Sequence, residues 1–527
     1  MLLAELVETS RRVAATPSRN AKVAELAAFL RRLAPEAIAI GVSYLSGEAR
    51  QGRSGIGSAL FDRARNDAPA AAPSLRIADV DAALERIAAT AGAGSQAERT
   101  RILAALLARA TAGESDFLRR LMLGELRQGA LESLMIDAVA AAASLPVATV
   151  RRAAMVAHGI ASVAHAALTQ GAEGLRRFEL LLMQPAAPML AQPIDDIAGA
   201  LRVLGSAAFE WKVDGARVQV HKAGDEVRVF TRNRNDVTAS VPEIVDALRA
   251  VPVRELILDG EAIALQAHGA PQPFQVTMRR FGRTLDVAQI RAELPLAVFF
   301  FDCLRHGADA LTAAPAAERF AALADALPAT LLMPRIVTAD AVVAEGFYDE
   351  ALRRGHEGVM AKSLGAPYEA GRRSAAWLKI KRLHTLDLVV LAAEWGHGRR
   401  KGFLSNLHLG ARDAQGGFVM LGKTFKGMTD EMLAWQTQAL LAREIDRDPY
   451  TVRVRPELVV EIAFNDLQAS PRYPDGLALR FARVKGYRSD KSAADADTID
   501  TVRAIHAGHL ARAKAESPAN GAVSAQM

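Results

Sequence analysis

Cysteine is nearly absent from this sequence. Cys303 is the only one in 527 residues, so neither an internal disulfide nor a multi-cysteine zinc site can form. Long apolar runs are also missing. The longest, such as residues 138–150, are interrupted by Pro146 and fall well short of the ~20 residues that a membrane span needs. We therefore expect no membrane partner, and a cytoplasmic protein is the simplest interpretation.

A secretion signal is not expected either, because Glu5 and Glu8 lie inside the stretch that would have to be apolar. The charge balance is tilted towards basic residues. The 65 Lys and Arg residues outnumber the 59 Asp and Glu residues, which gives a net charge of +6 and a pI near 9.5. This balance favours a polyanionic partner such as nucleic acid.

Changes in composition and in hydrophobic pattern divide the chain into four segments. Residues 1–185 are rich in Ala, Leu and Arg with helical spacing, which predicts an all-α region. Residues 186–383 mix short β-branched runs with helical pieces, which predicts an α+β domain. Residues 384–507 are mostly strand-like with one helix, which suits a small β-barrel. Residues 508–527 have little to bury and are expected to form a disordered tail.

The sequence GFVMLGKT at residues 417–424 matches the G-x-x-x-x-G-K-[ST] pattern of a phosphate-binding loop. Such a loop must lie between a strand and a helix, because its backbone N–H groups curl around the phosphates at the helix N-terminus. Here the four variable positions are apolar, follow a hairpin-like turn and are not followed promptly by a helix pattern. We therefore predict an ordinary strand.

A second lysine-centred motif, EWKVDGAR at residues 210–217, makes a different prediction. Lys212 is followed by Asp214, Gly215 and Arg217, and an alternating strand pattern starts at once. Lysine can act as a nucleophile, but it must first lose its proton, which needs burial or nearby cationic charge to lower its pKa. A surface lysine before a turn is the alternative, and this motif by itself does not separate the two.

Further short motifs follow in a fixed order. They are TRNRNDVT at 231–238, DGEAIA at 259–264, FFFDCL at 299–304, EGVMAK at 357–362, RRSAAWLKIK at 372–381 and RFARVKGYRSDK at 480–491. This series resembles that of the covalent nucleotidyltransferases, above all the ATP-dependent DNA ligases of the bacterial three-domain type. The segment at residues 123–142 looks like the most recognisable part of that family's helical domain. Ala482 is a departure, because many relatives have proline there.

The resemblance implies both a fold and an activity. The implied architecture is an all-α DNA-binding domain, an α+β nucleotidyltransferase domain of ATP-grasp-like adenylation type, and a C-terminal β-barrel of OB-fold type. In the implied reaction Lys212 takes AMP from ATP, AMP passes to the 5′-phosphate of a nick, and the 3′-OH then attacks that phosphate. ATP and Mg²⁺ are the implied cofactors. The implied partner is nicked double-stranded DNA, clamped by a monomer at the bacterial nucleoid.

The resemblance also assigns roles to single residues. ATP or AMP contacts are expected from Glu210, Arg217, Arg232, Glu261, Phe301, Arg373 and Lys379. Glu210 is expected beside the base edge and Phe301 against the adenine face, while the arginines grip ribose, AMP or the nick phosphate. Lys379 and Lys381 alternate along one strand, from which we expect only one of them to face the pocket. The resemblance implies that this residue is Lys379, which would hold the α-phosphate and help to lower the pKa of Lys212.

Glu261 and Glu357 carry oxygen donors of the kind that Mg²⁺ prefers, although Glu261 is also expected at the ribose. Arg480, Arg483 and Lys491 in the last motif are expected to swing over ATP and orient its pyrophosphate, after which the barrel rotates to admit DNA.

Two other functions remain open at this point. An RNA-capping-type guanylyltransferase uses the same lysine chemistry, and a non-catalytic protein with a basic helical domain and a barrel would bind duplex electrostatically. An NAD⁺-dependent ligase also carries a K-x-D-G core, but its four-cysteine zinc module is impossible with Cys303 alone.

Overall fold

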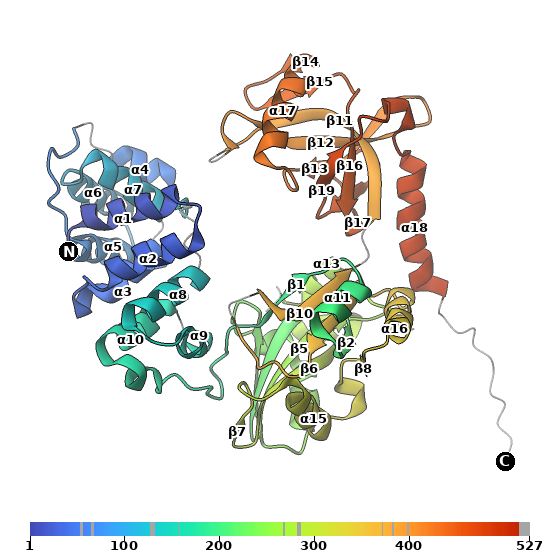
Figure 1. The fold of residues 1–527 in the computed structure, drawn as a ribbon, viewed down its shortest axis with the longest axis horizontal. Helices are drawn as coiled ribbons and strands as arrows, with labels where there is room; N and C mark the ends of the chain where they lie inside the picture. Colours follow the sequence, from blue (N-terminus) through green and yellow to red (C-terminus); the bar gives the residue numbers. More distant parts are fainter. Residues whose placement is uncertain are drawn as a thin grey trace.

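The computed structural model describes residues 1–52, 56–64, 68–126, 132–157, 159–266, 269–281, 286–370, 373–381, 384–397 and 400–515. Figure 1 shows three parts that follow one another along the chain: a helical part in blue, a mixed central part in green and yellow, and a strand-rich part in orange and red. None of the helices in these described ranges is long and apolar enough to cross a membrane.

Helices follow one another along the described residues of the first part of the chain. They are α1 (Leu3–Ala15), α2 (Arg19–Leu30), α3 (Pro35–Leu45), α4 (Ser58–Ala64), α5 (Ile77–Ala89), α6 (Ser95–Leu107), α7 (Ala112–Met122), α8 (Glu132–Ala143), α9 (Val147–Val156) and α10 (Ile160–Leu175). One apolar core joins them. The sequence determines where α7 begins, because the side chains of Thr111 and Glu114 each accept a hydrogen bond from the other residue's backbone N–H. Residues 127–131, within the segment at 123–142, lie outside the described residues.

The central domain contains two five-stranded sheets. Its strands are β1 (Leu190–Pro193), β2 (Ala207–Trp211), β3 (Ala216–Ala223), β4 (Glu226–Thr231), β5 (Glu255–Ala264), β6 (Leu296–His306), β7 (Asp309–Ala310), β8 (Arg335–Thr338), β9 (Gly358–Ser363) and β10 (Arg373–Lys381). Its helices are α11 (Ile197–Leu204), α12 (Pro242–Arg249), α13 (Phe274–Phe281), α14 (Val287–Glu293), α15 (Ala316–Ala326) and α16 (Ala341–Arg353). The sheet orders are β1-β10-β9-β2-β8 and β4-β3-β5-β6-β7. The short segment between β2 and β3 therefore crosses from one sheet to the other.

The third domain is a strand-rich unit around its own apolar core. Its elements are β11 (His384–Trp395), β12 (Leu404–Arg412), β13 (Phe418–Thr424), α17 (Asp430–Leu441), β14 (Glu444–Arg447), β15 (Thr451–Val454), β16 (Val459–Phe464), β17 (Asp466–Ala469), β18 (Leu477–Arg480), β19 (Arg483–Tyr487) and α18 (Ile499–Ala515). β12 and β13 pair as an antiparallel hairpin. The phosphate-loop-like sequence is therefore an ordinary strand, as predicted.

The expected boundary of the disordered tail, at residue 508, lies inside a helix. α18 continues to Ala515, past the expected boundary at residue 508, and residues 516–527 lie outside the described residues. Ile499 and Val502 anchor the start of this helix in the core of the third domain. The stretch that follows is rich in Ala, Arg and Lys, which favour helix and let it propagate beyond its anchored turn. The low apolar content of residues 508–527 argues against a hydrophobic core in this segment, but it does not argue against a helix.

The first and central domains are joined by hydrogen bonds as well as by the chain. The backbone N–H of Ala187 donates to Met155 O at 2.7 Å, and Nη1 of Arg234 donates to Ala157 O, at the end of α9, at 2.8 Å. Two buried side chains of β3 hold the connecting segment. Nδ1 of His221 accepts from the N–H of Met183 at 3.1 Å, and Oε1 of Gln219 accepts from that of Ala186 at 2.8 Å.

Candidate active site

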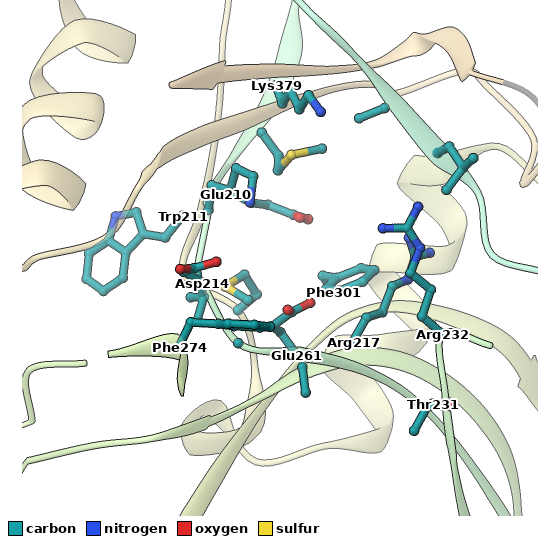
Figure 2. A pocket seen from close by; sticks show the side chains of 18 of the residues that line it. Glu210, Trp211, Asp214, Arg217, Thr231, Arg232, Glu261, Phe274, Phe301 and Lys379 are labelled. Carbon is teal, nitrogen blue, oxygen red and sulfur yellow. The ribbon is translucent and has the colours of Figure 1, made fainter. Parts of the chain in front are cut away.

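A cleft of about 880 Å³ opens between the two sheets of the central domain. Most of the predicted site residues line it, and Figure 2 shows Glu210, Arg217, Glu261, Phe301 and Lys379 with side chains around one common space. They come from β2, β3, β5, β6 and β10, elements distant in sequence that the two sheets bring together. The motif series thus converges on one cleft.

Lys212 lies in the segment that crosses between the sheets. Its backbone is fixed on both sides, because its N–H donates to Gly358 O at 2.8 Å and its carbonyl accepts from the N–H of Glu357 at 3.0 Å. The glycine of the motif is required by close packing. A Cβ on Gly215 would lie 2.4 Å from Ala262 O, a separation that real side chains do not reach. The K-x-D-G sequence therefore holds Lys212 on an inflexible segment.

The side chain of Lys212 is engaged by a carboxylate. Its Nζ lies 2.5 Å from Oε2 of Glu357, and only 20% of the lysine side chain is exposed. Burial alone would lower the pKa of Lys212, but the charges of Glu357, Glu261 and Asp214 outweigh it and raise that pKa. The expectation that a nearby cation depresses this pKa is therefore wrong for this structure, because carboxylates surround the ammonium.

Lys379 and Lys381 both line the cleft, so the expectation that only one of them would face it is wrong. Residues two apart on a strand point to the same side, and it is Leu378 and Ile380 that point the other way into a core cluster. Nζ of Lys381 lies 2.6 Å from Oε2 of Glu357, the atom that also pairs with Lys212. Burial and the charge of Lys212 lower the pKa of Lys381.

Glu210 is almost fully buried at 1% exposure and holds two cations. Its carboxylate lies 2.6 Å from Nη2 of Arg335 and 2.6 Å from Nζ of Lys362. Lys362 in turn sits over the rings of Phe301 and Trp377, with Nζ 4.3 Å and 4.2 Å from their centroids. Burial lowers the pKa of Lys362 although Glu210 opposes this. One end of the cleft is therefore aromatic with a buried ion pair beneath it.

Arg217 is fixed by a bidentate contact. Its Nε and Nη2 donate to the two carboxylate oxygens of Asp259 at 3.0 Å and 2.5 Å, and Nη1 donates to Met189 O at 2.7 Å. The hydroxyl of Tyr368 completes the group, because it donates to Asp259 at 2.6 Å and accepts from Nη2 of Arg217 at 3.1 Å. Burial would lower the pKa of Arg217, but the interactions with Asp259 and Tyr368 outweigh this effect and raise that pKa above its usual value.

Two further carboxylates face the cleft. Glu261 lies opposite Arg217 in the register of β5 and β3, and burial raises its pKa to about 7. Burial and the charge of Glu357 raise the pKa of Asp214. Among the described residues no cluster of three or more His, Cys, Asp and Glu is arranged to hold a metal on its own. Asp214 and Glu261 are therefore cleft-lining carboxylates whose pKa values both lie above the usual range.

Arg232 lies in the turn after β4, and Figure 2 shows it beside Arg217 at one side of the cleft. Phe301 is 8% exposed and contributes to the aromatic end already described. The backbone of Arg373 begins β10, but its side chain lies outside the described part of the structure.

The third domain reaches the cleft through β18. Nη1 of Arg480 lies 3.0 Å from Oδ2 of Asp214, and Phe481 lines the cleft with a left-handed φ of 56°. Arg483 is not among the residues that line the cleft, and Nζ of Lys491 pairs with Asp387 at 2.5 Å within the third domain. Within the described part of the chain, Arg480 is thus the one of the three expected pyrophosphate-orienting residues that forms an ion pair with a residue of the cleft, Asp214.

Comparison with known proteins decides the family. Residues 188–381 match the family described as the ATP dependent DNA ligase domain, residues 400–491 its C terminal region and residues 56–140 the DNA ligase N terminus. The chain is 62% identical to the "Probable DNA ligase" of an Anaeromyxobacter species over 97% of its own length and 99% of that protein. The chain belongs to the ATP-dependent DNA ligases. It is also 58% identical to the "Probable DNA ligase" of Sorangium cellulosum, over 98% of this ligase and 97% of that protein.

A solved structure, Pmar-Lig_PreS3, shares the fold of this ligase. It superposes with a TM-score of 0.58 at 18% sequence identity, covering 92% of this chain and 99% of its own. The motif reasoning missed three residues of the site: Lys381, Tyr368 and Arg335. Strand periodicity would have found Lys381, whereas nothing in the sequence connects Tyr368 or Arg335 with the residues that they contact.

Proposed function

We propose that this ligase seals nicks in duplex DNA and that Lys212 is its nucleophile. The observation that carries the proposal is the position of Lys212, whose backbone is fixed between two sheets and whose Nζ contacts Glu357. Lys212 lines the same cleft as Glu210, Arg217, Arg232, Glu261, Phe301 and Lys379. The volume of about 880 Å³ suits a nucleotide. The P-loop-like Lys423 lies instead on the hairpin of the third domain, on β13.

In the first step Nζ of Lys212 attacks the α-phosphorus of ATP. A P–N bond forms, the bond from the α-phosphorus to the bridging oxygen breaks, and pyrophosphate leaves. Lys212 must give up its proton before it attacks. Once Glu357, the carboxylate in contact with that proton, is drawn away, the proton would pass to solvent water. Because these carboxylates raise the pKa of Lys212, the chain stores the nucleophile as an ammonium, and activation requires Glu357 to be drawn away.

The adenosine moiety fits the aromatic end of the cleft. We assign Phe301 to the adenine face and Glu210 to the base edge, where Glu210 is held by Arg335 and Lys362. The phosphates and ribose would be gripped by the cationic side, which comprises Arg217, Arg232, Arg373, Lys379 and Lys381. Phosphoryl transfer depends chiefly on positioning and on charge that stabilises the phosphate oxygens, which these groups supply.

Mg²⁺ suits the acidic side of the cleft, because it takes one or two carboxylates together with substrate phosphates. Glu261, with its pKa raised to about 7 by burial, gains from a nearby cation. Glu261 and Glu357 would hold the ion, which supplies charge neutralisation on the phosphate oxygens. Glu357 pairs with two lysines here, so its coordination to Mg²⁺ would also break its ion pair with Lys212.

The outer domains complete the proposal. The helical domain, residues 1–185, would bind duplex DNA, and the strand-rich domain, residues 384–507, would act as an OB-fold that closes over the nucleotide and then turns to the DNA. The contact of Arg480 with Asp214 supports closure over the cleft. Arg483 and Lys491 would join Arg480 at the pyrophosphate only after further rotation.

The experiment is nick sealing by the purified protein with Mg²⁺, ATP and a 5′-phosphorylated nicked duplex, with NAD⁺ and GTP in parallel. Lys212→Ala should abolish both lysyl-AMP formation and sealing. Lys423→Ala is the matched control, because it removes the lysine of the competing motif and should leave both unchanged. Labelling of Lys212 by GTP would favour guanylyl transfer instead, and duplex binding without sealing by any nucleotide would favour a binding protein.

A further inference from the structure

A second cavity, of about 240 Å³, lies between the first and central domains. One wall is α9, which presents Ala148, Arg151, Arg152 and Met155 at helical spacing. The other wall consists of residues 312–313 and 367–370 of the central domain. This cavity shares no lining residue with the nucleotide cleft.

Arg151 is a buried cation with a donor left over. The residue is 8% exposed, and its Nη2 donates to Oδ1 of Asp137 at 3.1 Å. Oδ2 of the same Asp137 accepts from Nη2 of Arg19 at 2.6 Å, so one carboxylate serves two guanidinium groups. Nη1 of Arg151 has no hydrogen-bond partner among the described residues.

A buried guanidinium donor without a partner is costly, since it has lost water and gained nothing in exchange. Arg152 brings a second guanidinium to the same cavity, whereas Glu369 is the one carboxylate on its walls. The arginine fork matches phosphate oxygens in geometry as well as in charge. The volume is below that of pockets for drug-sized ligands, which suits one or two phosphate groups and excludes a whole nucleotide.

We propose that this cavity is a second phosphate-binding site, with Arg151 and Arg152 as its cationic groups. The phosphate comes either from a free anion such as inorganic phosphate or pyrophosphate, or from a phosphodiester of a bound strand. The site also touches the catalytic machinery. Tyr368 lines the cavity, and its hydroxyl bonds to Asp259, which holds Arg217 in the nucleotide cleft.

The variants are chosen to change charge without loss of packing. Arg152→Gln removes the exposed guanidinium, and Arg151→Lys keeps a cation for Asp137 but removes the unpaired donor. Glu369→Gln removes the opposing carboxylate. Arg176→Gln, directly after the end of α10, is the matched control, because its side chain is 76% exposed, pairs with Glu173 and does not line the cavity. Nick sealing is measured for every variant, so that a loss of ligase activity can be distinguished from a loss of phosphate binding at the second cavity.

The first arm is calorimetric titration of each full-length variant with pyrophosphate and with inorganic phosphate. For the free-anion source we expect two pyrophosphate sites in the wild type and one in Arg152→Gln and Arg151→Lys. Glu369→Gln should bind phosphate at least twofold more tightly, and Arg176→Gln should equal the wild type.

The second arm measures binding of nicked duplex as a function of salt. For the phosphodiester source, Arg152→Gln should lower the slope of log Kd against log salt by about one, the value for one lost contact, with Arg176→Gln unchanged. A response in either arm supports the proposal and identifies the source. The proposal is overturned if neither arm responds, or if Arg176→Gln has the same effect as Arg152→Gln.

Discussion

Nζ of Lys212 and Nζ of Lys381 share one oxygen, Oε2 of Glu357, at 2.5 Å and 2.6 Å. The carboxylate therefore bridges the proposed nucleophile to a second cation on a different strand. The pKa of Lys212 is raised and that of Lys381 is lowered. Of the two lysines, the one expected to react is thus the more strongly protonated, and pH and the bridge should both control the first step.

The rate of lysyl-AMP formation should rise with pH. The attacking form of Lys212 is the neutral amine, and a raised pKa makes this form scarce below the titration of the group. Glu357→Gln removes the main charge that raises the pKa of Lys212, so the rising limb should move to lower pH. The pH dependence of Lys212 modification by an amine reagent, in the protein without ATP and Mg²⁺, checks this, because Glu357 pairs with Lys212 in that state. A limb that stays in place or moves to higher pH in Glu357→Gln would contradict the role given to the carboxylate.

Lys379→Met and Lys381→Met should both slow adenylylation. Their side chains face the same cleft, and loss of a cation at the phosphates should cost at least about tenfold in rate, which is about 1.4 kcal/mol of transition-state stabilisation. Rapid-quench measurement of lysyl-AMP reports the effect. Lys401→Met, at an exposed position of the third domain, is the control. If Lys381→Met behaves like this control, Lys381 has no part in the step.

Arg483→Ala should impair formation of lysyl-AMP and spare the sealing of a nick that already carries AMP. The reason is that pyrophosphate is present only in the first step, to which the rotating domain is assigned. Both steps are measured with adenylylated and unmodified nicks. Lys485→Ala, on the same strand and paired with Glu461, is the control. Equal loss of the two steps in Arg483→Ala would rule out a specific role at pyrophosphate.

Acid should destabilise the central domain through His221. Burial lowers the pKa of this residue to about 3, whereas a histidine in an unfolded chain has a pKa of about 6.5. The unfolded chain therefore binds more protons, so this contribution is complete above pH ~6.5 and falls as the pH drops towards 3, by at most ~1.4 kcal/mol per pH unit. Urea unfolding at pH 7 and pH 5 measures the loss. The difference should shrink in His221→Gln and persist in His397→Gln, an exposed position.

Arg319 and Asp302 form a fully buried pair, with Nε donating to Oδ1 at 2.7 Å. Nη1 of Arg319 also donates to the carbonyls of Ala314 and Ala366. Asp302→Ala leaves the guanidinium buried without its counterion, which should lower the free energy of unfolding by roughly 3–5 kcal/mol. Arg305→Gln breaks a more exposed pair with Glu255 and should cost less than ~1 kcal/mol. Similar urea midpoints for the two variants would contradict this ranking.

Local patterns in the sequence predicted where helical and strand-rich segments lie, whereas the expectation that the motifs share one site came from the family resemblance. Helical spacing and strand alternation are short-range signals, and the K-x-D-G motif carries its own geometry through Gly215. The sequence also predicted correctly that Lys423 lies on a strand, because a phosphate-binding loop needs a helix directly after it.

The remaining features depend on contacts between distant parts of the chain. Tyr368 meets Arg217 across 151 residues, and Arg480 meets Asp214 across 266, so no local pattern links either pair. The raised pKa of Lys212 required knowing which carboxylates surround it. The prediction for Lys381 failed for a different reason, since the period of a strand already places it beside Lys379.

The contacts of Met183 and Ala186 with β3 determine where the catalytic part can be separated from the rest. The family match to the central domain begins at residue 188, yet the buried His221 and Gln219 accept backbone hydrogen bonds from residues before that point. A recombinant fragment that starts at 188 would lose both backbone donors. Nδ1 of His221 would be left without its partner, at roughly 1–3 kcal/mol, whereas Oε1 of Gln219 would still lie 2.9 Å from Nε2 of His221. A fragment that starts near residue 180 would retain both donors, so the smallest stable adenylating fragment begins inside the chain segment that leads out of the helical domain.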